Sequence, residues 1–250
     1  MPRPQTAIIR KAIILKTHVW SADLEEFVTR IRLESRCHGI DLFILMHDET
    51  GELHSQVLSP DLQSRLMLFT EANIRSTYPS GFYSMWQSNH WVLMWFFKQK
   101  PDYDYYWSIE YDVRISGRSD YVWTLDAEED FLYTIGGFSR PNHIYANHYE
   151  GSMLDTIYKR FGFLQLARYS HKALEYLNMC FESGNNGHDE LITFSLILDS
   201  NSGLTHSNTN LKDMIRGTWT WLDRYAPSNR LAYERLHPHT RKPHIFHPIK

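Results

Sequence analysis

The chain has 250 residues, a formal net charge of −3, 42% hydrophobic residues and 22% charged residues, ordinary values for a globular protein of one large or two small domains. Because the chain carries no overall positive charge, nucleic acid is excluded as a main partner. Aromatic residues make up 14%, a surplus that fits either a large aromatic core or surfaces that stack on sugar rings.

The cysteines and the N-terminal residues bear on cellular location. Cys37 and Cys180 lie far apart in a chain with no metal-binding cysteine spacing, which favours a reduced protein. Residues 1–15 lack the apolar run of a signal peptide, and no stretch reaches the roughly 20 apolar residues of a transmembrane helix. We therefore expect a cytoplasmic protein, with peripheral contact at the inner face of the membrane left open.

The first 48 residues have the spacing of a strand–helix–strand unit. Residues 11–17 (KAIILKT) form a short apolar run typical of a buried strand. Ser21 is a suitable N-cap for a helix that ends near Cys37, and residues 41–46 (DLFILM) indicate a second buried strand. This order predicts parallel pairing with a right-handed crossover.

The remaining pattern predicts one α/β domain over residues 1–250. The expected elements are helices at 62–74, 84–98 and 170–182, strands at 103–115 and 131–135, and a helical or partly extended segment at 189–198. From residue 199 onward the composition predicts mostly polar loops.

The segment YDYYWSIEYDVRISG, residues 103–117, contains the two acidic residues that are the first candidates for a metal site. On a strand, Glu110 and Asp112 would share one face about 7 Å apart, at the carboxyl end where open α/β sheets bind ligands. Two carboxylates there suit Mg²⁺ or Mn²⁺ held against a diphosphate. The alternative is that one carboxylate pairs with Arg114 or Arg118 and the other is solvated.

This segment resembles the acidic metal motif of GT-A glycosyltransferases in its Glu-x-Asp form. It is more narrowly similar to an uncharacterised glycosyltransferase-like family, in which a Tyr-Tyr-Trp run precedes Glu-x-Asp-Val-Arg and a Gly. The tail PHIFHPIK resembles the terminal His-Pro-x-Lys of such proteins. The resemblance implies a Rossmann-like GT-A domain whose mixed central sheet is flanked by helices. Residues 1–117 would be its nucleotide-binding half and residues 118–250 its acceptor-binding half.

The resemblance also implies a metal site and a phosphate contact. Asp112 is the first candidate ligand and His247 the second. Glu110 either binds the metal directly or lies beside it, near the ribose. Lys250 would contact a phosphate as a point charge. The alternative for His247 and Lys250 is an exposed or disordered tail.

A general base is implied at the helix start that follows Gly187. Asp189 resembles the acidic base of inverting GT-A enzymes, and Glu190 is the second candidate. Acidic residues are also favoured at a helix N-terminus for the helix dipole alone, so these residues have a purely structural alternative.

Contacts to the nucleotide are expected at the ends of the first two strands. Thr17, His18 and Asp48 are the natural contacts of the donor base and ribose, although each also fits an ordinary turn. Arg114 either reaches the diphosphate bidentately or neutralises Asp112. Asn147, His148, Tyr149 and Trp123 are weaker candidates for acceptor contacts, for which packing is the simpler interpretation.

The predicted function is therefore metal-dependent transfer of a sugar, hexosyl or related, from a nucleotide-diphosphate sugar to a glycan or lipid-linked saccharide, as in polysaccharide biosynthesis. A metal-dependent hydrolase or phosphoesterase is the first alternative, although the sequence has no HExxH cluster. A non-catalytic carbohydrate-binding protein is the second, supported by the aromatic surplus alone. A Rossmann dehydrogenase is disfavoured, because no G-x-G-x-x-G follows the first strand, and the P-loop motif is missing too.

Overall fold

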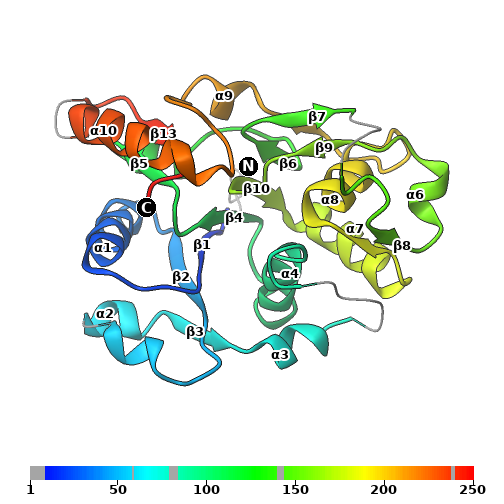
Figure 1. The fold of residues 1–250 in the computed structure, drawn as a ribbon, viewed down its shortest axis with the longest axis horizontal. Helices are drawn as coiled ribbons and strands as arrows, with labels where there is room; N and C mark the ends of the chain where they lie inside the picture. Colours follow the sequence, from blue (N-terminus) through cyan, green and yellow to red (C-terminus); the bar gives the residue numbers. More distant parts are fainter. Residues whose placement is uncertain (1–8, 58, 79–83, 140–143, 238–239) are drawn as a thin grey trace, which may run out of the picture.

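The computed structural model describes residues 9–57, 59–78, 84–139, 144–237 and 240–250. Its centre is a seven-stranded mixed sheet (Figure 1). In spatial order the strands are β12 (His206–Ser207), β6 (Phe131–Tyr133), β10 (Leu166–Ser170), β4 (Tyr105–Glu110), β1 (Lys11–Thr17), β2 (Asp41–His47) and β3 (Leu66–Phe69).

The strand directions place several carboxyl ends at one edge of the sheet. β1 pairs in parallel with β2 and with β4, and β2 pairs in parallel with β3. β10 runs antiparallel to both of its neighbours, β4 and β6. The strands β1, β2 and β4 therefore end side by side. The parallel pairing of β1 with β2 is the one that the strand–helix–strand opening predicted.

Three short two-stranded sheets lie outside the central sheet. Their strands are β5 (Arg114–Ser116) with β13 (His244–Phe246), β7 (Gly136–Phe138) with β9 (Phe161–Gly162), and β8 (Tyr149–Glu150) with β11 (Asn186–Gly187).

Helices cover both faces of the sheet (Figure 1). They are α1 (Ala22–Arg36), α2 (Pro60–Gln63), α3 (Glu71–Arg75), α4 (His90–Gln99), α5 (Asp120–Trp123), α6 (Met153–Thr156), α7 (His171–Glu182), α8 (Asp189–Ile197), α9 (Thr209–Lys212) and α10 (Ala226–Leu236), with 3₁₀ turns η1 (Leu53–Gln56) and η2 (Asp223–Tyr225). Among the described helices, none has the length and apolar character needed to cross a membrane.

The two sides of the sheet carry two separate apolar clusters. Ala12 and Ile14 of β1 pack in a cluster with α4, α7 and α8, while Ile13 and Leu15 pack in a second cluster with α1. Because successive side chains of a strand point to opposite faces, a strand covered on both faces is apolar throughout. This explains the run KAIILKT and confirms the predicted α/β class with a mixed sheet flanked by helices.

Several predicted elements agree with the structure. Ser21 caps α1 by accepting a hydrogen bond from the backbone of Leu24, and Ser170 caps α7 in the same way through Ala173. The buried helix predicted at 84–98 is present but begins only at His90. The segment at 189–198 is helical as α8.

Two regions differ from the prediction. The segment 62–74 is not one helix, because it contains β3 between the short helices α2 and α3. The segment after residue 199 is mostly turn and loop, as predicted, but it also contains α9, α10 and β13, which the prediction left out. In both regions the pairing that stabilises the strand is with a distant segment, β2 for β3 and β5 for β13, which local periodicity does not report.

Candidate active site

A turn at the end of β4 brings the two motif carboxylates together. β4 ends at Glu110, and the backbone of Val113 donates a hydrogen bond of 3.1 Å to the carbonyl of Glu110. Asp112 therefore lies in the turn between β4 and β5. The single strand predicted over 103–115 is wrong, because this turn interrupts it. The carboxylates meet through the turn and not through the alternation of a strand.

The C-terminal tail returns to this turn. β13 pairs antiparallel with β5, with Phe246 opposite Arg114, so the next residue, His247, lies beside Asp112. The backbone of Ile249 donates a 2.8 Å hydrogen bond to the carbonyl of Asp112. His247 is 3% exposed and its ring packs 5.2 Å from that of Trp219. The tail is therefore buried from Ile245 to Ile249, in contrast to the alternative of an exposed segment for His247, whereas Lys250 is exposed.

Asn229 of α10 also holds the tail. Its buried side-chain amide donates to the carbonyls of Thr218, His247 and Pro248, at 2.9, 2.9 and 3.3 Å. Its Oδ1 accepts a hydrogen bond from the backbone of Thr218. One side chain thus ties α10, the segment before it and the tail around His247.

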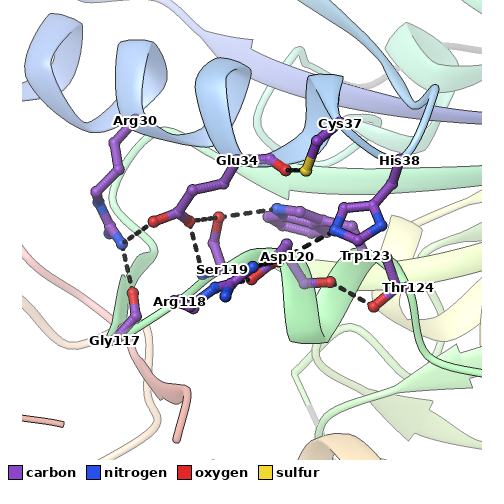
Figure 2. A network of polar contacts seen from close by, with 10 residues as sticks. All are labelled: Arg30, Glu34, Cys37, His38, Gly117, Arg118, Ser119, Asp120, Trp123 and Thr124. Carbon is purple, nitrogen blue, oxygen red and sulfur yellow. Dashed lines mark hydrogen bonds and ion pairs between the residues drawn. The ribbon is translucent and has the colours of Figure 1, made fainter. Parts of the chain in front are cut away.

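The other side of β5 is anchored to α1 (Figure 2). Oε2 of Glu34 accepts hydrogen bonds from the backbone and the hydroxyl of Ser119, at 2.7 and 2.6 Å, and Arg30 donates to the carbonyl of Gly117 at 2.6 Å. Figure 2 shows these side chains of α1 pointing at the segment that follows β5. The loop that supports the tail strand is therefore fixed to the helix layer.

Glu110, Asp112 and His247 form a group suited to a metal ion. One ligand atom from each lies within 4.8 Å of the others. Oδ1 of Asp112 and Nε2 of His247 are 3.4 Å apart. Within the described part of the chain, no hydrogen bond reaches the buried Oδ1 of Asp112 or Nδ1 of His247.

These three donors fit a divalent cation. Buried polar atoms normally have a hydrogen-bond partner, and a buried carboxylate oxygen that accepts no hydrogen bond is costly unless a positive charge lies beside it. Two carboxylates and an imidazole form a donor set acceptable to Mn²⁺, and the carboxylates alone suit Mg²⁺. The three residues predicted as metal ligands therefore lie together, and their role as ligands stays a prediction.

Glu110 has two further partners. Asn89 donates a 2.7 Å hydrogen bond to Oε1 of Glu110, and Nζ of the buried Lys16 lies 3.7 Å from the same oxygen. Burial raises the pKa of Glu110; the Lys16 ammonium opposes this rise and the Asp112 carboxylate adds to it. Lys16 thus supplies a positive charge next to the acidic pair.

A cleft of about 800 Å³ opens over this group. Most of the site residues predicted from the sequence line it: Thr17, His18, Glu110, Asp112, Asp189, Glu190, His247 and Lys250. They come from the ends of β1 and β4, the start of α8 and the C-terminal tail. The fold therefore gathers residues that are far apart in the sequence around one hollow.

Asp189 occupies the first turn of α8 and is 6% exposed. Its Oδ1 accepts a 2.7 Å hydrogen bond from the backbone of Glu190 and lies 3.3 Å from Nδ1 of His188. Burial, followed by the charge of Glu110, raises the pKa of Asp189 to about 7. A carboxylate in this state can take up a proton near neutral pH.

The other acidic residue of this turn is held differently. Oε1 of Glu190 accepts a 3.2 Å hydrogen bond from the side-chain amide of Gln165. Both Asp189 and Glu190 line the cleft. For Asp189, the pKa of about 7 lies in the range useful to a base.

Thr17, His18 and Lys250 line the cleft and have contacts of their own. The Thr17 hydroxyl donates to the carbonyl of Val19. The His18 ring packs edge-on to Tyr111 at 4.8 Å, and burial, with His47 as the next cause, lowers the pKa of His18. Nζ of Lys250 forms a 2.7 Å ion pair with Asp223.

The structure does not bring Asp48 or Arg114 to the cleft lining. Asp48 accepts hydrogen bonds from the backbones of Gly51, Glu52 and His54. Burial opposes their effect, but these bonds lower the pKa of Asp48 to about 2. Its carboxylate thus organises the loop after β2.

Arg114 points to α1. It donates a 2.6 Å hydrogen bond to Oδ2 of Asp23 and two more to the carbonyls of Tyr111 and Val113, and its guanidinium packs over the ring of Phe27. Its ionic partner is Asp23, so the alternative role of neutralising Asp112 is also not observed.

Several other residues that line the cleft were not predicted from the sequence. Lys16 lies inside an apolar strand pattern, and Asn89 stands in a turn before α4. Trp86, Tyr145 and His188 also line the cleft. None has a motif of its own, although His188 directly precedes the predicted base. The suggested acceptor contacts Asn147, His148, Tyr149 and Trp123 do not line the cleft.

Comparisons with known proteins give one family and several similar folds. Residues 40–127 match a family described as "Protein of unknown function (DUF3405)". No curated protein matches the chain by sequence.

Among solved structures, the chain is similar to the galactosyltransferase LgtC in complex with donor and acceptor sugar analogs, at 12% identity and a TM-score of 0.42, over 79% of this chain and 73% of that one. It is similar to the inositol-1-phosphate CTP transferase of T. maritima at 12% identity and a TM-score of 0.45, over 80% and 85%. The catalytic domain of Drosophila β1,4-galactosyltransferase 7 gives 12% identity and a TM-score of 0.41, over 80% and 64%. The function proposed below rests on the geometry of the cleft.

Proposed function

We propose that this protein is a metal-dependent, inverting glycosyltransferase that uses a nucleotide-diphosphate sugar as donor. One observation carries the proposal: the donor set of Glu110, Asp112 and His247 shares a cleft with a buried carboxylate, Asp189, whose pKa is raised to about 7. Such an arrangement pairs a place for a leaving diphosphate with a base near neutral pH.

In the proposed reaction, the base and the metal site act on different steps. A hydroxyl oxygen of the acceptor forms a bond to the anomeric carbon of the donor sugar, and the bond from that carbon to the diphosphate oxygen breaks. The hydroxyl proton passes to the Asp189 carboxylate, and the nucleoside diphosphate leaves with the bonding electron pair. A bound divalent cation would offset the negative charge that grows on the leaving group.

The chain's own charges assist both substrates. Asp112 and His247 would hold the cation, with Glu110 as a third ligand or as a neighbour held by Asn89 and Lys16. Lys250 would leave its surface ion pair with Asp223 to contact a phosphate, a small cost for an exposed pair. Thr17 and His18 would contact the nucleoside.

The two halves of the chain then have different tasks. We assign donor binding to residues 1–117, completed by His247 and Lys250 from the tail. Residues 118–250 would supply Asp189 and the acceptor side. A glycan or lipid-linked saccharide is the proposed acceptor, and a cytoplasmic location with peripheral membrane contact remains part of this proposal.

The test is nucleotide-sugar turnover with a matched pair of variants. Wild-type protein with Mn²⁺ or Mg²⁺ should release nucleoside diphosphate from one member of a donor panel. Asp112→Asn should lower this rate by at least about a hundredfold, because charge stabilisation of the leaving group is lost. Asp213→Asn, a change at an exposed carboxylate outside the cleft, is the control and should be without effect.

Two results would contradict the proposal. Wild-type rates in Asp112→Asn would remove the metal assignment. Metal-dependent cleavage of a simple phosphoester, with no use of any nucleotide-sugar, would support the hydrolase alternative instead.

A further inference from the structure

An aromatic cluster lies at the mouth of the cleft and has no task in the mechanism above. It consists of Trp86, Tyr145 and His188, all of which line the cleft. The rings of Tyr145 and His188 are stacked at 4.0 Å with an interplanar angle of 14°. Trp86 packs edge-on to both, at 5.8 and 5.7 Å.

One ring of the cluster is buried and another is largely exposed. His188 is buried, whereas Trp86 is 61% exposed and the neighbouring Ile144, which also lines the cleft, is 73% exposed. Exposed apolar surface at the rim of a cleft, rimmed by polar groups, is typical of ligand sites. The indole of Trp86 is thus held in place by two rings while its outer surface remains free for a ligand.

The cluster is directly attached to the candidate base. His188 precedes Asp189 in the chain, and the backbone of Asp189 donates a 2.8 Å hydrogen bond to the carbonyl of Gln87, the residue after Trp86. A ligand ring on Trp86 would therefore lie next to the Asp189 carboxylate. The metal ligands come instead from the turn after β4 and from the C-terminal tail.

We infer that Trp86, supported by Tyr145 and His188, is the stacking surface for a pyranose ring of the acceptor, which presents its hydroxyl to Asp189. This inference rests on the proposed glycosyl transfer and names the acceptor's chemistry at that site. A pyranose has an apolar C–H face for an aromatic ring and hydroxyls for carboxylates, and the cluster beside Asp189 and Glu190 offers both kinds of contact.

The experiment measures acceptor-side and donor-side binding separately. The probes are the methyl pyranosides of glucose, galactose, mannose and N-acetylglucosamine, followed by saturation-transfer NMR and titration. UDP and GDP, each with Mn²⁺, are titrated in parallel. The variants are Trp86→Ala, Trp86→Phe and, as control, Tyr158→Ala, which removes an aromatic ring that is 62% exposed and lies outside the cleft.

At least one methyl pyranoside should bind the wild type, and Trp86→Ala should weaken it by about tenfold, since an aromatic contact of this kind contributes roughly that factor. Trp86→Phe should lose less, and Tyr158→Ala nothing. Nucleotide affinity should stay within about twofold in all variants. Because Trp86 is exposed, the thermal unfolding of Trp86→Ala should match that of the wild type.

Other outcomes overturn the inference in distinguishable ways. Unchanged pyranoside affinity in Trp86→Ala, or no binding of any pyranoside by the wild type, removes the stacking role while nucleotide binding stands. An equal loss of UDP or GDP affinity assigns the cluster to the nucleobase. A wild type that turns over no nucleotide-sugar of the donor panel contradicts the proposed function itself, and with it the acceptor role, even where a pyranoside binds.

Discussion

Asp189 combines a helix-terminal position with a buried carboxylate whose pKa is raised to about 7. If Asp189 is the proposed base, its carboxyl is protonated below its pKa and cannot accept the acceptor's proton, so the turnover rate should rise as the pH passes that pKa and then level. Asp189→Asn should lower kcat by about 10²–10⁴-fold, the usual contribution of a general base. The measurement is kcat against pH in both proteins.

The neighbouring acid provides the control. Glu190→Gln should lower kcat much less and keep the pH profile, because the Glu190 carboxylate is held by Gln165. A larger loss in Glu190→Gln than in Asp189→Asn would exchange the two roles. An equal fall in donor affinity and kcat for Asp189→Asn would indicate a structural role instead, since an N-terminal acid also stabilises the helix.

The prediction that the carboxylates of Glu110 and Asp112 lie close together is confirmed, but the structural reason differs from the predicted one. Glu110 and Asp112 do lie together, but a turn after β4 joins them, and the strand alternation on which the prediction rested ends at Glu110. Residues i and i+2 lie close together both on one face of a strand and within a turn, so their spacing in the sequence does not tell a strand from a turn. Arg114 and Asp48 were predicted to contact the nucleotide, but they bind other partners. Arg114 binds Asp23, and Asp48 binds the backbone of Gly51–His54. These contacts depend on loop conformation, which local sequence patterns do not indicate.

Elements with a strong local signal were predictable. Strands β1 and β2 and helices α1 and α7 have caps or apolar runs within their own residues, and their predicted bounds agree with the structure to within about two residues. The strands β3 and β13 were missed because each is only three or four residues long and is stabilised by a distant partner. The position of His247 depends on one of those pairings.

At the element scale, a change at Asn229 tests whether α10 positions His247, the proposed metal ligand. Asn229→Ala removes the donor to the carbonyls of His247 and Pro248, and it should lower the free energy of unfolding by about 1–3 kcal/mol, because buried carbonyls lose their partner. The affinity for Mn²⁺ should fall as well, since His247 is less well held. Thermal unfolding and Mn²⁺ titration measure the two effects.

The control for this variant is Asn210→Ala, which truncates an exposed asparagine in α9. It should leave both quantities unchanged. If Asn229→Ala loses stability but keeps wild-type Mn²⁺ affinity at a temperature where it is folded, the tail supports the fold without positioning the ligand. The Glu34–Ser119 contacts then remain as the anchor of β5 (Figure 2).

At the scale of the whole molecule, the cleft joins segments that the sequence separates by more than 200 residues. Thr17 and His18 follow β1, Glu110 ends β4, Asp189 begins α8, and His247 lies beyond β13. The order of strands in the sheet decides which of these ends meet, and no local pattern contains that order. The resemblance carried by residues 103–117 and by the tail therefore predicted more of the site than periodicity did.

Because the cleft is built from both ends of the chain, a ligand that binds there should stabilise the whole fold. With UDP or GDP and Mn²⁺ at about 100 times Kd, mass action adds about 2.7 kcal/mol to the free energy of unfolding. For a chain of this size that corresponds to a rise in Tm of roughly 5–10 °C, from about 2–4 °C per kcal/mol. Either component alone should give a smaller shift, since metal and diphosphate support each other's binding. Asp112→Asn should abolish the combined effect, and a shift that persists in this variant would show that the nucleotide binds without the Glu110–Asp112–His247 group.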